Sequence, residues 1–450
     1  MGVEKNLYME HPAVRALTRR EVREWRLEKR VRVGPSQHDD DDSDCPKPVR
    51  TWLEAAFPEL ITAELEASGF PEPTVIQSQA WPVALSGRDM VGLASTGSGK
   101  TLCFALPAIV HVIAQRILEP GDGPIALMLA PTRELALQIK GECDRFGSSS
   151  GVKNTAVYGG VPKGPQQRDL QHGVEMAIAT PGRLLDMIDC GATNLKRTTF
   201  LVLDEADRML DLGFEPQLRQ IIQLTPPPHD RQTLMWSATW PREVRRLAES
   251  FLRRPLFVQV NEAASLRVNE SIEQRFEVCT DERDRAYKFF LSLPHLNVGD
   301  GSAKLIIFCN KGQGCDRLKG ELKNRGVAAE SLHGGKSQQE RDWVMQQFRS
   351  GAVTTLLATD VAARGLDVKD VGVVINYEAP SQAEDYVHRV GRAGRGGAKG
   401  LALSFLTPAN APVARELVAM LRKSRQPCPP ALEWLARSGG GGDAYRRWAR

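Results

Sequence analysis

The segment Asp89–Thr101 reads DMVGLASTGSGKT and decides the fold class. Its first six residues are a short apolar run that predicts a buried strand, and the apolar stretch that follows the segment predicts a helix. Between the two, Gly97 and Gly99 permit a tight loop, and Lys100 and Thr101 stand where the helix begins. A strand, a Gly-rich loop and a helix in this order predict an α/β fold with a phosphate-binding loop at the sheet edge.

The loop itself is close to the pattern G-x-x-x-x-G-K-[ST], with Ala94 in place of the first glycine. Backbone N–H groups would converge on phosphate oxygens, Lys100 would add a cation, and the Thr101 hydroxyl would bind Mg²⁺. A chance Gly-rich turn is the alternative, but the flanking strand and helix disfavour it. The residues expected to bind a nucleotide here are Ala94, Ser95, Thr96, Gly97, Ser98, Gly99, Lys100 and Thr101.

Short apolar runs alternate with longer helical stretches in two blocks of the chain, as in open and mostly parallel sheets. Residues 261–272 separate the blocks and are predicted to form a linker. Nearly every run is followed by a polar or Gly-rich cluster, at the edge where such sheets bind ligands. The predicted strands are 89–94, 125–130, 175–179, 200–204 and 233–237, then 304–309, 329–333, 354–359, 371–376 and 400–406.

Three carboxylates follow the predicted strand 200–204, in the sequence LVLDEADRML at Leu201–Leu210. Charges at the end of a buried strand are costly unless a cation meets them. Beside a phosphate loop, Asp204 is expected to hold Mg²⁺ and Glu205 to polarise the attacking water. Asp207 is expected to form hydrogen bonds within the fold. The alternative is an acidic helix N-terminus that favours the helix dipole.

Three arginines recur at three-residue spacing in HRVGRAGR, namely Arg389, Arg392 and Arg395, with Gly391 and Gly394 between them. An ordinary solvated helix face does not need these glycines. An arginine supplied from a second domain can stabilise the charge on the phosphoryl oxygens in the transition state, so hydrolysis would require the domains to close. A surface cluster of arginines is the alternative.

Taken together, these motifs resemble the DEAD-box family of ATP-dependent RNA helicases, in the family's order and over roughly residues 50 to 425. The resemblance implies two tandem RecA-like domains with ATP and Mg²⁺ in the cleft between them. GFPEPTVIQ resembles the family's Q motif, so Gln77 would read the adenine edge and Phe70 would stack on the ring. Trp52 stands where the family usually has an upstream phenylalanine.

The same resemblance implies roles for residues in both domains. Ser237 and Thr239 would couple hydrolysis to RNA opening, and Gln338 and Arg341 would take part in the domain contact. Near the nucleotide and its γ-phosphate the family places residues that match Asp367, His388, Arg392 and Arg395. The implied RNA contacts are Pro131, Thr132, Arg133, Gly159, Gly160, Thr180, Pro181, Gly182 and Arg183 in the first domain, and the HGG motif (His333, Gly334, Gly335) and Thr359 in the second.

The two ends of the chain differ in composition from its centre. Residues 15–32 carry eight Lys or Arg against three Glu at helical spacing, and the run Asp39–Asp44 predicts a solvated, disordered break. The run Ser438–Asp443 predicts a flexible linker. We therefore expect an N-terminal extension at 1–50, domains at 51–262 and 273–426 joined by a linker at 263–272, and a tail at 427–450.

Bulk properties fit a protein with reduced thiols. The 450 residues are 42% hydrophobic and carry a net charge of +4, and the eight cysteines form no C-x-x-C pair. No apolar run is long enough to span a membrane, and the N-terminus has no signal-peptide region. We expect a monomer in the nucleus, the nucleolus included, or in the cytoplasm, not secreted and not bound to a membrane.

The leading hypothesis is an RNA-dependent ATPase that unwinds short duplexes, with RNA as the partner. The RNA-side motifs contain few aromatics, which predicts contacts to the backbone and little sequence preference. An ATP-gated RNA clamp and a DNA translocase are the alternatives. MEHPAVRALTRREVREWR, QAWP and SATWP resemble the p68-like branch, whose members work in ribosome assembly and messenger RNA processing. Gly439–Gly442 lacks the interleaved arginines that many relatives carry in their tails.

Overall fold

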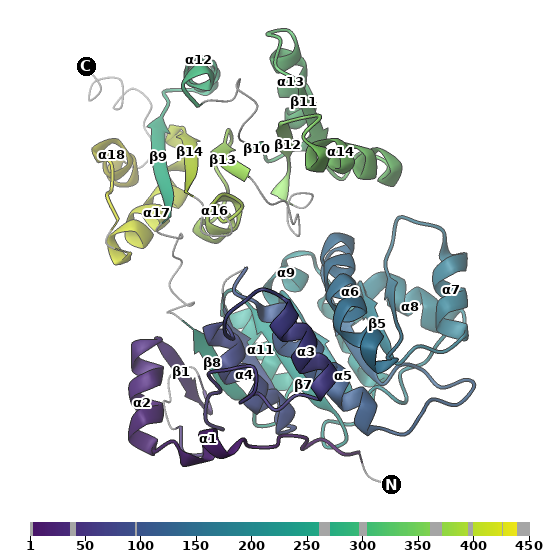
Figure 1. Cartoon of the computed structure of the whole chain (residues 1–450). Coiled ribbons are helices and arrows are strands. Elements are labelled where there is room, and N and C mark those ends of the chain that lie inside the picture. Colours follow the sequence, from purple (N-terminus) through teal and green to yellow (C-terminus); the bar gives the residue numbers. More distant parts are fainter. Residues whose placement is uncertain are drawn as a thin grey trace. The chain divides into compact units, whose positions relative to one another are not determined.

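The computed structural model describes residues 3–36, 42–94, 97–260, 271–296, 304–360, 371–394, 399–424 and 426–438. The chain forms two compact units, unit 1 (residues 1–264) and unit 2 (residues 265–450), each built around one sheet flanked by helices (Figure 1). The predicted α/β class is therefore confirmed for both blocks.

Unit 1 contains an eight-stranded sheet with the order β1-β8-β2-β7-β6-β3-β5-β4. All neighbouring strands are parallel except β1, which pairs antiparallel with β8. The strands are β1 (Val31–Gly34), β2 (Met90–Leu93), β3 (Ala126–Leu129), β4 (Asn154–Val157), β5 (Met176–Ala179), β6 (Phe200–Leu203), β7 (Gln232–Ser237) and β8 (Leu256–Val260).

Helices cover both faces of this sheet, which explains why its central strands β2, β7, β6, β3 and β5 are buried at every position and mostly apolar. Along β3, Ala126 and Met128 join one hydrophobic cluster, whereas Leu127 and Leu129 join the other. The first cluster contains α3 (Glu59–Ala67), α4 (Val75–Leu85), α5 (Lys100–Ala114) and α6 (Arg133–Gly147). The second contains α7 (Lys163–Gln171), α8 (Pro181–Asp189), α9 (Ala206–Asp211), α10 (Glu215–Gln223) and α11 (Arg242–Phe251).

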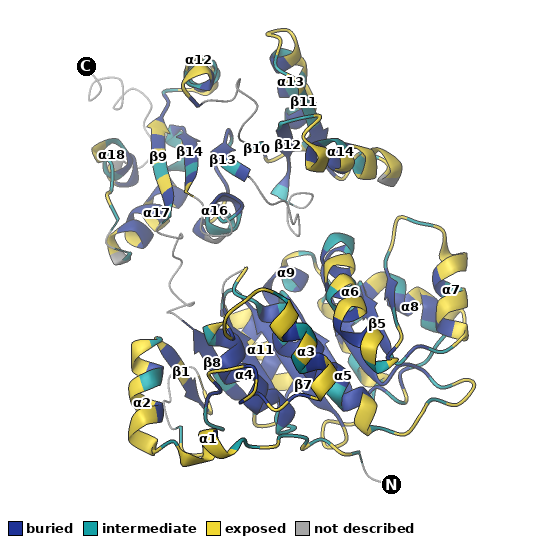
Figure 2. Cartoon of the chain, viewed as in Figure 1, coloured by how far each residue is buried: buried dark blue, intermediate teal, exposed yellow. Residues whose placement is uncertain are grey.

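Unit 2 repeats this plan with six parallel strands in the order β11-β12-β10-β13-β14-β9. Buried residues lie on the sheet and on the inner faces of the helices, as Figure 2 shows for both units. The strands are β9 (Ile272–Val278), β10 (Lys304–Phe308), β11 (Ala329–Leu332), β12 (Thr355–Ala358), β13 (Val371–Asn376) and β14 (Gly400–Leu406).

The helices of unit 2 also divide between the two faces of its sheet. One face packs against α14 (Gln338–Ser350), α16 (Ala383–Val390), α17 (Ala411–Lys423) and α18 (Pro430–Ser438). The other packs against α12 (Glu282–Ser292) and α13 (Gly312–Lys323). Short 3₁₀ turns occur at Ser148–Ser150, Leu293–Leu296 and Pro408–Asn410.

All ten predicted strands are confirmed, with ends that differ by one residue at most. The sequence reading missed β1, β4, β8 and β9. Three of these are edge strands, and β8 lies next to an edge. A strand at the edge of a sheet needs no continuous apolar run. The sequences of β9 (IEQRFEV) and β1 (VRVG) contain polar residues, so no apolar run predicted these two strands.

The N-terminal segment, predicted as an extension outside the first domain, packs into unit 1. The basic stretch forms α1 (Pro12–Ala16) and α2 (Arg19–Glu28), and β1 then joins the sheet. The expected solvated acidic break is wrong at Asp42, which accepts a hydrogen bond from the buried Arg26, and Asp44 pairs with Arg88. Asp39–Asp41 lie outside the described residues.

At the other end, α18 packs against the unit 2 core through buried Leu432 and Leu435, within the predicted tail. Gly439 and the residues after it lie outside the described part of the chain, as do 261–270 of the predicted linker. Within the described ranges, no helix is long and apolar enough to cross a membrane.

A buried histidine links the phosphate-loop helix to the strand that carries the acidic motif. His111 on α5 is 1% exposed, and its Nε2 lies 2.8 Å from the Thr199 hydroxyl just before β6. Burial lowers the pKa of His111 from 6.5 to about 4. The folded state therefore holds this imidazole neutral at a pH where the unfolded chain would protonate it.

We expect this group to make unit 1 less stable in acid. As pH falls below 6.5, the unfolded state gains a proton that folded His111 does not bind until about pH 4. The loss amounts to roughly 2 kcal/mol between pH 7 and pH 5. Urea unfolding of the wild type and His111→Gln at both pH values checks this, because glutamine stays neutral throughout. An identical pH dependence in the two proteins would contradict it.

Candidate functional site

The predicted motifs of unit 1 meet along the edge of its sheet that the carboxyl ends of the parallel strands form. The spatial order β2-β7-β6-β3-β5-β4 differs from the chain order. It sets the phosphate loop after β2 beside the SAT motif (Ser237–Thr239) after β7, and SAT beside the DEAD motif (Asp204–Asp207) after β6. Three further motifs continue along the same edge after β3, β5 and β4: PTREL (131–135), TPGR (180–183) and GG (159–160). The edge therefore has a phosphate-loop side and a side that carries the predicted RNA motifs.

The phosphate loop leads directly into α5. Gly97 and Gly99 have φ angles of +79° and +92°, so both occupy the left-handed region that favours glycine. A Cβ at Gly99 would also lie 2.8 Å from the Gln77 Nε2. Thr101, the predicted Mg²⁺ ligand, lies in the first turn of α5, and Ala94 is buried at the end of β2. Ser95 and Thr96 lie outside the described residues.

Lys100 is the most informative residue of this loop. It is only 7% exposed, and its Nζ has no hydrogen-bond partner among the residues that the structure describes. A buried ammonium without a partner is costly, so the site is built for an anion that comes from outside the chain. The first turn of α5 adds backbone N–H groups and the positive end of the helix dipole.

Two predicted catalytic carboxylates stand at the end of β6. Asp204 is 3% exposed, and burial raises its pKa to about 6, although Lys100 opposes the shift. Its Oδ1 accepts a hydrogen bond from the Glu205 backbone N–H. Glu205 has a φ of +52°, an uncommon backbone angle for a residue with a side chain. A buried carboxylate near an unpartnered ammonium is an arrangement that a metal-bound phosphate would satisfy.

The prediction that Asp207 forms hydrogen bonds within the fold is confirmed, and its partners belong to the SAT motif. Its Oδ2 accepts hydrogen bonds from the backbone N–H groups of Ala238 and Thr239 and from the Thr239 hydroxyl (2.8 Å). The acidic motif is thus joined to the segment that was expected to couple hydrolysis to RNA opening. Ser237 in this motif is fully buried, and its hydroxyl has no hydrogen-bond partner within the described ranges.

The Q-motif residues lie next to the phosphate loop. The Gln77 Oε1 accepts a hydrogen bond from the Thr74 N–H, and the Gln77 Nε2 donates to the Gly99 carbonyl (3.1 Å). One amide hydrogen remains for a ligand. Phe70 is 64% exposed, which leaves its ring open for stacking. Trp52 is buried, and its Nε1 donates to the Phe70 carbonyl.

On the side with the predicted RNA motifs, side chains hold the loops in place. Thr132 caps α6, and the Arg133 guanidinium lies over the Tyr158 ring at 4.8 Å. Arg183 donates to the Val161 carbonyl and to the Gln166 side chain, so it supports the loop after β4. Sequence reasoning missed Tyr158 and Gln166, although Tyr158 immediately precedes the GG motif.

This edge also carries the remaining predicted RNA-contact residues of unit 1. Gly160 has a φ of +82°. Thr180 is the N-cap residue of α8, which therefore points its N-terminus at the same edge. These remaining residues are Pro131, Gly159, Gly160, Thr180, Pro181 and Gly182.

In unit 2, the HGG motif follows β11. The His333 Nε2 lies 3.1 Å from the Asp316 Oδ2, and its Nδ1 accepts a hydrogen bond from the Gly335 N–H. Gly334 and Gly335 are exposed. The Thr359 backbone N–H, after the adjacent β12, donates to the Leu332 carbonyl at the end of β11. The histidine therefore shapes the loop, and the two glycines present their backbone.

The first two arginines of the unit 2 motif are buried, which excludes the surface-cluster alternative for them. Arg389 is 2% exposed and forms a bidentate pair with Asp360, with both N–O distances at 2.6 Å. Arg392 is 5% exposed, and its Nε donates to the His388 carbonyl. Arg395, and Asp367 as well, lie outside the described residues.

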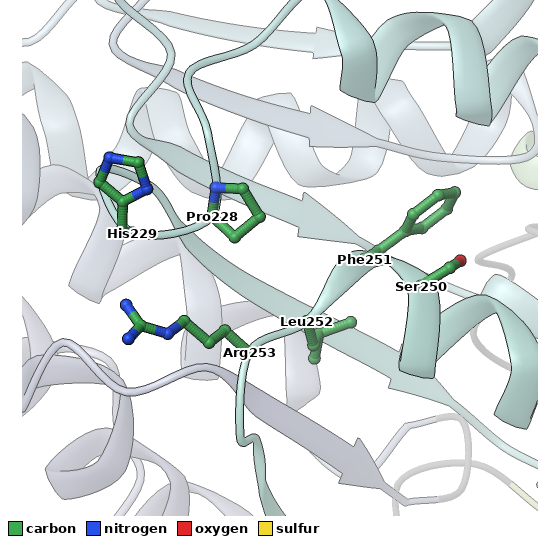
Figure 3. Close-up of a pocket in the computed structure, with 6 residues that line it drawn as sticks. All are labelled: Pro228, His229, Ser250, Phe251, Leu252 and Arg253. Atoms are coloured by element: carbon green, nitrogen blue, oxygen red, sulfur yellow. The ribbon is translucent and has the colours of Figure 1, made fainter.

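A pocket of about 540 Å³ lies elsewhere in unit 1 (Figure 3). Pro228, His229, Leu252 and Arg253 line it, and these residues precede β7 and β8. It therefore opens at the opposite end of these strands from the motifs. The candidate site is therefore identified by its charged residues and phosphate loop, and not by this pocket.

Comparisons with known proteins agree with this geometry. The DEAD/DEAH box helicase family model matches residues 74–247, and the helicase conserved C-terminal domain model matches residues 257–397. The chain is 52% identical over 442 residues to ATP-dependent RNA helicase DBP2 of Saccharomyces cerevisiae, covering 98% of this chain and 78% of that protein. It is 52% identical over 435 residues to DEAD-box ATP-dependent RNA helicase 20 of Arabidopsis thaliana, with 97% and 84% covered.

Solved structures show the same likeness. S. cerevisiae Dbp5 bound to RNA and ADP BeF3 matches with a TM-score of 0.73 and 27% identity, over 89% of this chain and 100% of that one. The yeast DEAD-box splicing factor Prp28 matches with a TM-score of 0.53 and 31% identity, over 94% of this chain and 95% of that one.

Proposed function

Because the chain belongs to the DEAD-box family of ATP-dependent RNA helicases and to its p68-like branch, we propose that it separates short RNA duplexes locally, with little sequence preference. The chain is an RNA-dependent ATPase built from two RecA-like domains. The observation that best supports the assignment of its active site is the buried Lys100, whose ammonium has no hydrogen-bond partner in the described part of the chain.

We propose that Lys100 and the first turn of α5 bind the ATP phosphates, while Gln77 and Phe70 select adenine. Asp204 and Thr101 would hold Mg²⁺, which would neutralise charge on the phosphoryl oxygens. Glu205 would accept the proton of the attacking water. The burial of Asp204 near Lys100 supports this assignment, because a metal cation would offset the cost of burying the carboxylate and a phosphate would accept a hydrogen bond from the Lys100 ammonium.

Residues 273–426 would supply Arg392 and Arg395 to the transition state. Hydrolysis would then need both domains to engage ATP, and the RNA strand would favour that engagement. The RNA-side residues contain Gly, Pro, Thr and Arg with few exposed aromatics, which supports contacts to phosphates and 2′-hydroxyls. Bending of one strand would release the other, and hydrolysis would reset the enzyme.

Strand displacement tests this function against the clamp alternative. A short RNA duplex is mixed with the protein and either ATP or a non-hydrolysable analogue, and released strand is measured over time. Repeated release with ATP, and at most one release per protein with the analogue, is the expected result. Equal release in both would favour the clamp, and ATP hydrolysis stimulated equally by DNA would contradict selectivity for RNA.

The cellular setting is a further proposal. All eight cysteines are free, which fits a reducing compartment such as the nucleus or the cytoplasm. Resemblance to the p68-like branch favours ribosome assembly or messenger RNA processing, with the protein acting as a monomer. RNAs crosslinked in cells to Glu205→Gln protein, which is expected to retain its RNA, would identify the pathway.

Lys100→Ala should weaken ATP binding by about 10- to 100-fold, because a charge-assisted contact to phosphate is lost. Without nucleotide, its unfolding midpoint should stay close to that of the wild type, because the described residues give the Nζ no hydrogen bond to lose and relief from burying the ammonium offsets the lost attraction to Asp204. Fluorescent nucleotide titration and thermal unfolding measure the two effects. Lys140→Ala, which removes an exposed ion pair on α6, is the control. ATP affinity near that of the wild type would remove the phosphate-loop assignment.

A further inference from the structure

We propose that Arg26 in the N-terminal segment is a positioning residue for the adenine site, acting through helix α4. This inference rests on the proposed contact of Gln77 with adenine. Its starting point is burial: Arg26 is 5% exposed although it belongs to a helix whose other arginines face solvent. A buried guanidinium is stable only where acceptors are fixed around it.

The local structure of α2 directs this side chain inward. Thr18 and Glu21 form a capping box that fixes where the helix begins. Val22 and Arg26, four residues apart, then form its buried stripe. By contrast, the Arg20 side chain is 86% exposed and pairs with Glu24 on the same helix. The helix therefore presents one specific arginine to the interior of unit 1.

Three acceptors surround the guanidinium, one on α4 and two in the loop 42–46. The Nε donates to the Gln79 Oε1 (2.9 Å), the Nη1 to the Asp42 Oδ2 (2.7 Å) and the Nη2 to the Pro46 carbonyl (3.0 Å). Gln79 is fully buried, and its Nε2 donates to the same Pro46 carbonyl (2.9 Å). The result is a closed polar network in which each group fixes the position of the others.

Gln79 connects this network to the nucleotide side, because it lies on α4 two residues after Gln77. The Gln77 Oε1 caps α4 at Thr74, and its Nε2 reaches the Gly99 carbonyl at the phosphate loop. Arg26 therefore fixes α4 through Gln79 on one side of the helix, while Gln77 on another side contacts the phosphate loop. The Val49 N–H, which donates to the Ser78 carbonyl (2.9 Å), ties the N-terminal segment to α4 between these two residues.

A small shift of α4 would move the Gln77 amide relative to the phosphate loop. Ten of the eleven residues of α4 are buried, so packing keeps the helix in the unit even if one polar contact is lost. The polar contacts instead set its position along and around its axis. Loss of the Arg26 network should therefore impair recognition of adenine more than it impairs the chemical step.

The test measures RNA-stimulated hydrolysis of ATP and GTP by the full chain with Arg26→Lys. Lysine retains a charge near Asp42 but lacks the planar fork that reaches three acceptors. We expect KM for ATP to rise about tenfold with kcat within about twofold, and the preference for ATP over GTP to fall. Arg20→Ala, which removes a charge from the exposed face of α2, should leave all three values unchanged.

Gln77→Ala tests the adenine contact separately from the role of Arg26, because it removes the proposed contact directly. A raised KM in Gln77→Ala but not in Arg26→Lys, with nucleotide preference intact, would overturn the role of Arg26. No change in Gln77→Ala would overturn the adenine assignment itself and with it this inference. Thermal unfolding without nucleotide is the second measurement. A fall in kcat proportional to unfolded protein, at constant KM, would show that Arg26 serves folding alone.

Discussion

Replacing Glu205 by glutamine should reduce RNA-stimulated ATP hydrolysis by about 10²- to 10⁴-fold, the range that positioned general bases contribute. Glutamine keeps the size of the side chain but cannot accept the proton of the attacking water. ATP and RNA should stay bound, because the phosphate-binding residues and the RNA-side loops are unchanged. Phosphate release, nucleotide titration and RNA titration measure the three quantities.

The structure supports Glu205 over its acidic neighbours for this role. Asp207 is committed to three donors of the SAT segment, and Asp204 is buried and accepts the Glu205 N–H. Glu205 is the partly exposed member, and its left-handed backbone angle sets the direction of the side chain. Glu215→Gln, on the exposed face of α10 in the same unit, is the matched control. Rapid turnover by Glu205→Gln would exclude it as the base.

Replacing Arg392 by alanine should have a comparable or larger effect, a loss of about 10³- to 10⁵-fold in RNA-stimulated hydrolysis. The guanidinium is proposed to stabilise charge that develops on the phosphoryl oxygens in the transition state. Binding of ATP to the full chain should change little, because Lys100 and Gln77 belong to unit 1. The expected signature is a large fall in kcat with a small change in nucleotide affinity.

Burial of Arg392 requires a stability control, since its Nε donates to the His388 carbonyl in the fold of unit 2. Thermal unfolding identifies any loss of folded protein, and Arg349→Ala removes an exposed arginine from α14 of the same unit. An Arg392→Ala protein that is folded and hydrolyses ATP at the wild-type rate would end the proposal that unit 2 completes the active site. Equal loss of ATP affinity and kcat would assign Arg392 to ground-state binding.

Local sequence patterns were sufficient for the fold class, for ten of the fourteen strands that the structure describes, and for the chemistry-bearing motifs. The physical reason is that a buried parallel strand is a continuous apolar run, and a phosphate loop or an acidic motif is contiguous in sequence. Four strands were not predicted because their residues are mixed in polarity: the edge strands β1, β4 and β9, and β8, which lies next to β1.

Only the tertiary structure decided which motifs lie side by side. The strand order β2-β7-β6 brings Lys100 close enough to influence Asp204 across 104 residues of sequence. In unit 2, the side-chain contacts show that Arg389 is an ion-pair partner of Asp360, although the three-residue spacing of the arginines gave no distinction between Arg389 and Arg392. Long-range hydrogen bonds depend on strand order and helix packing, which no local periodicity encodes, so the role of Arg26 at α4 could not be read from its basic helix.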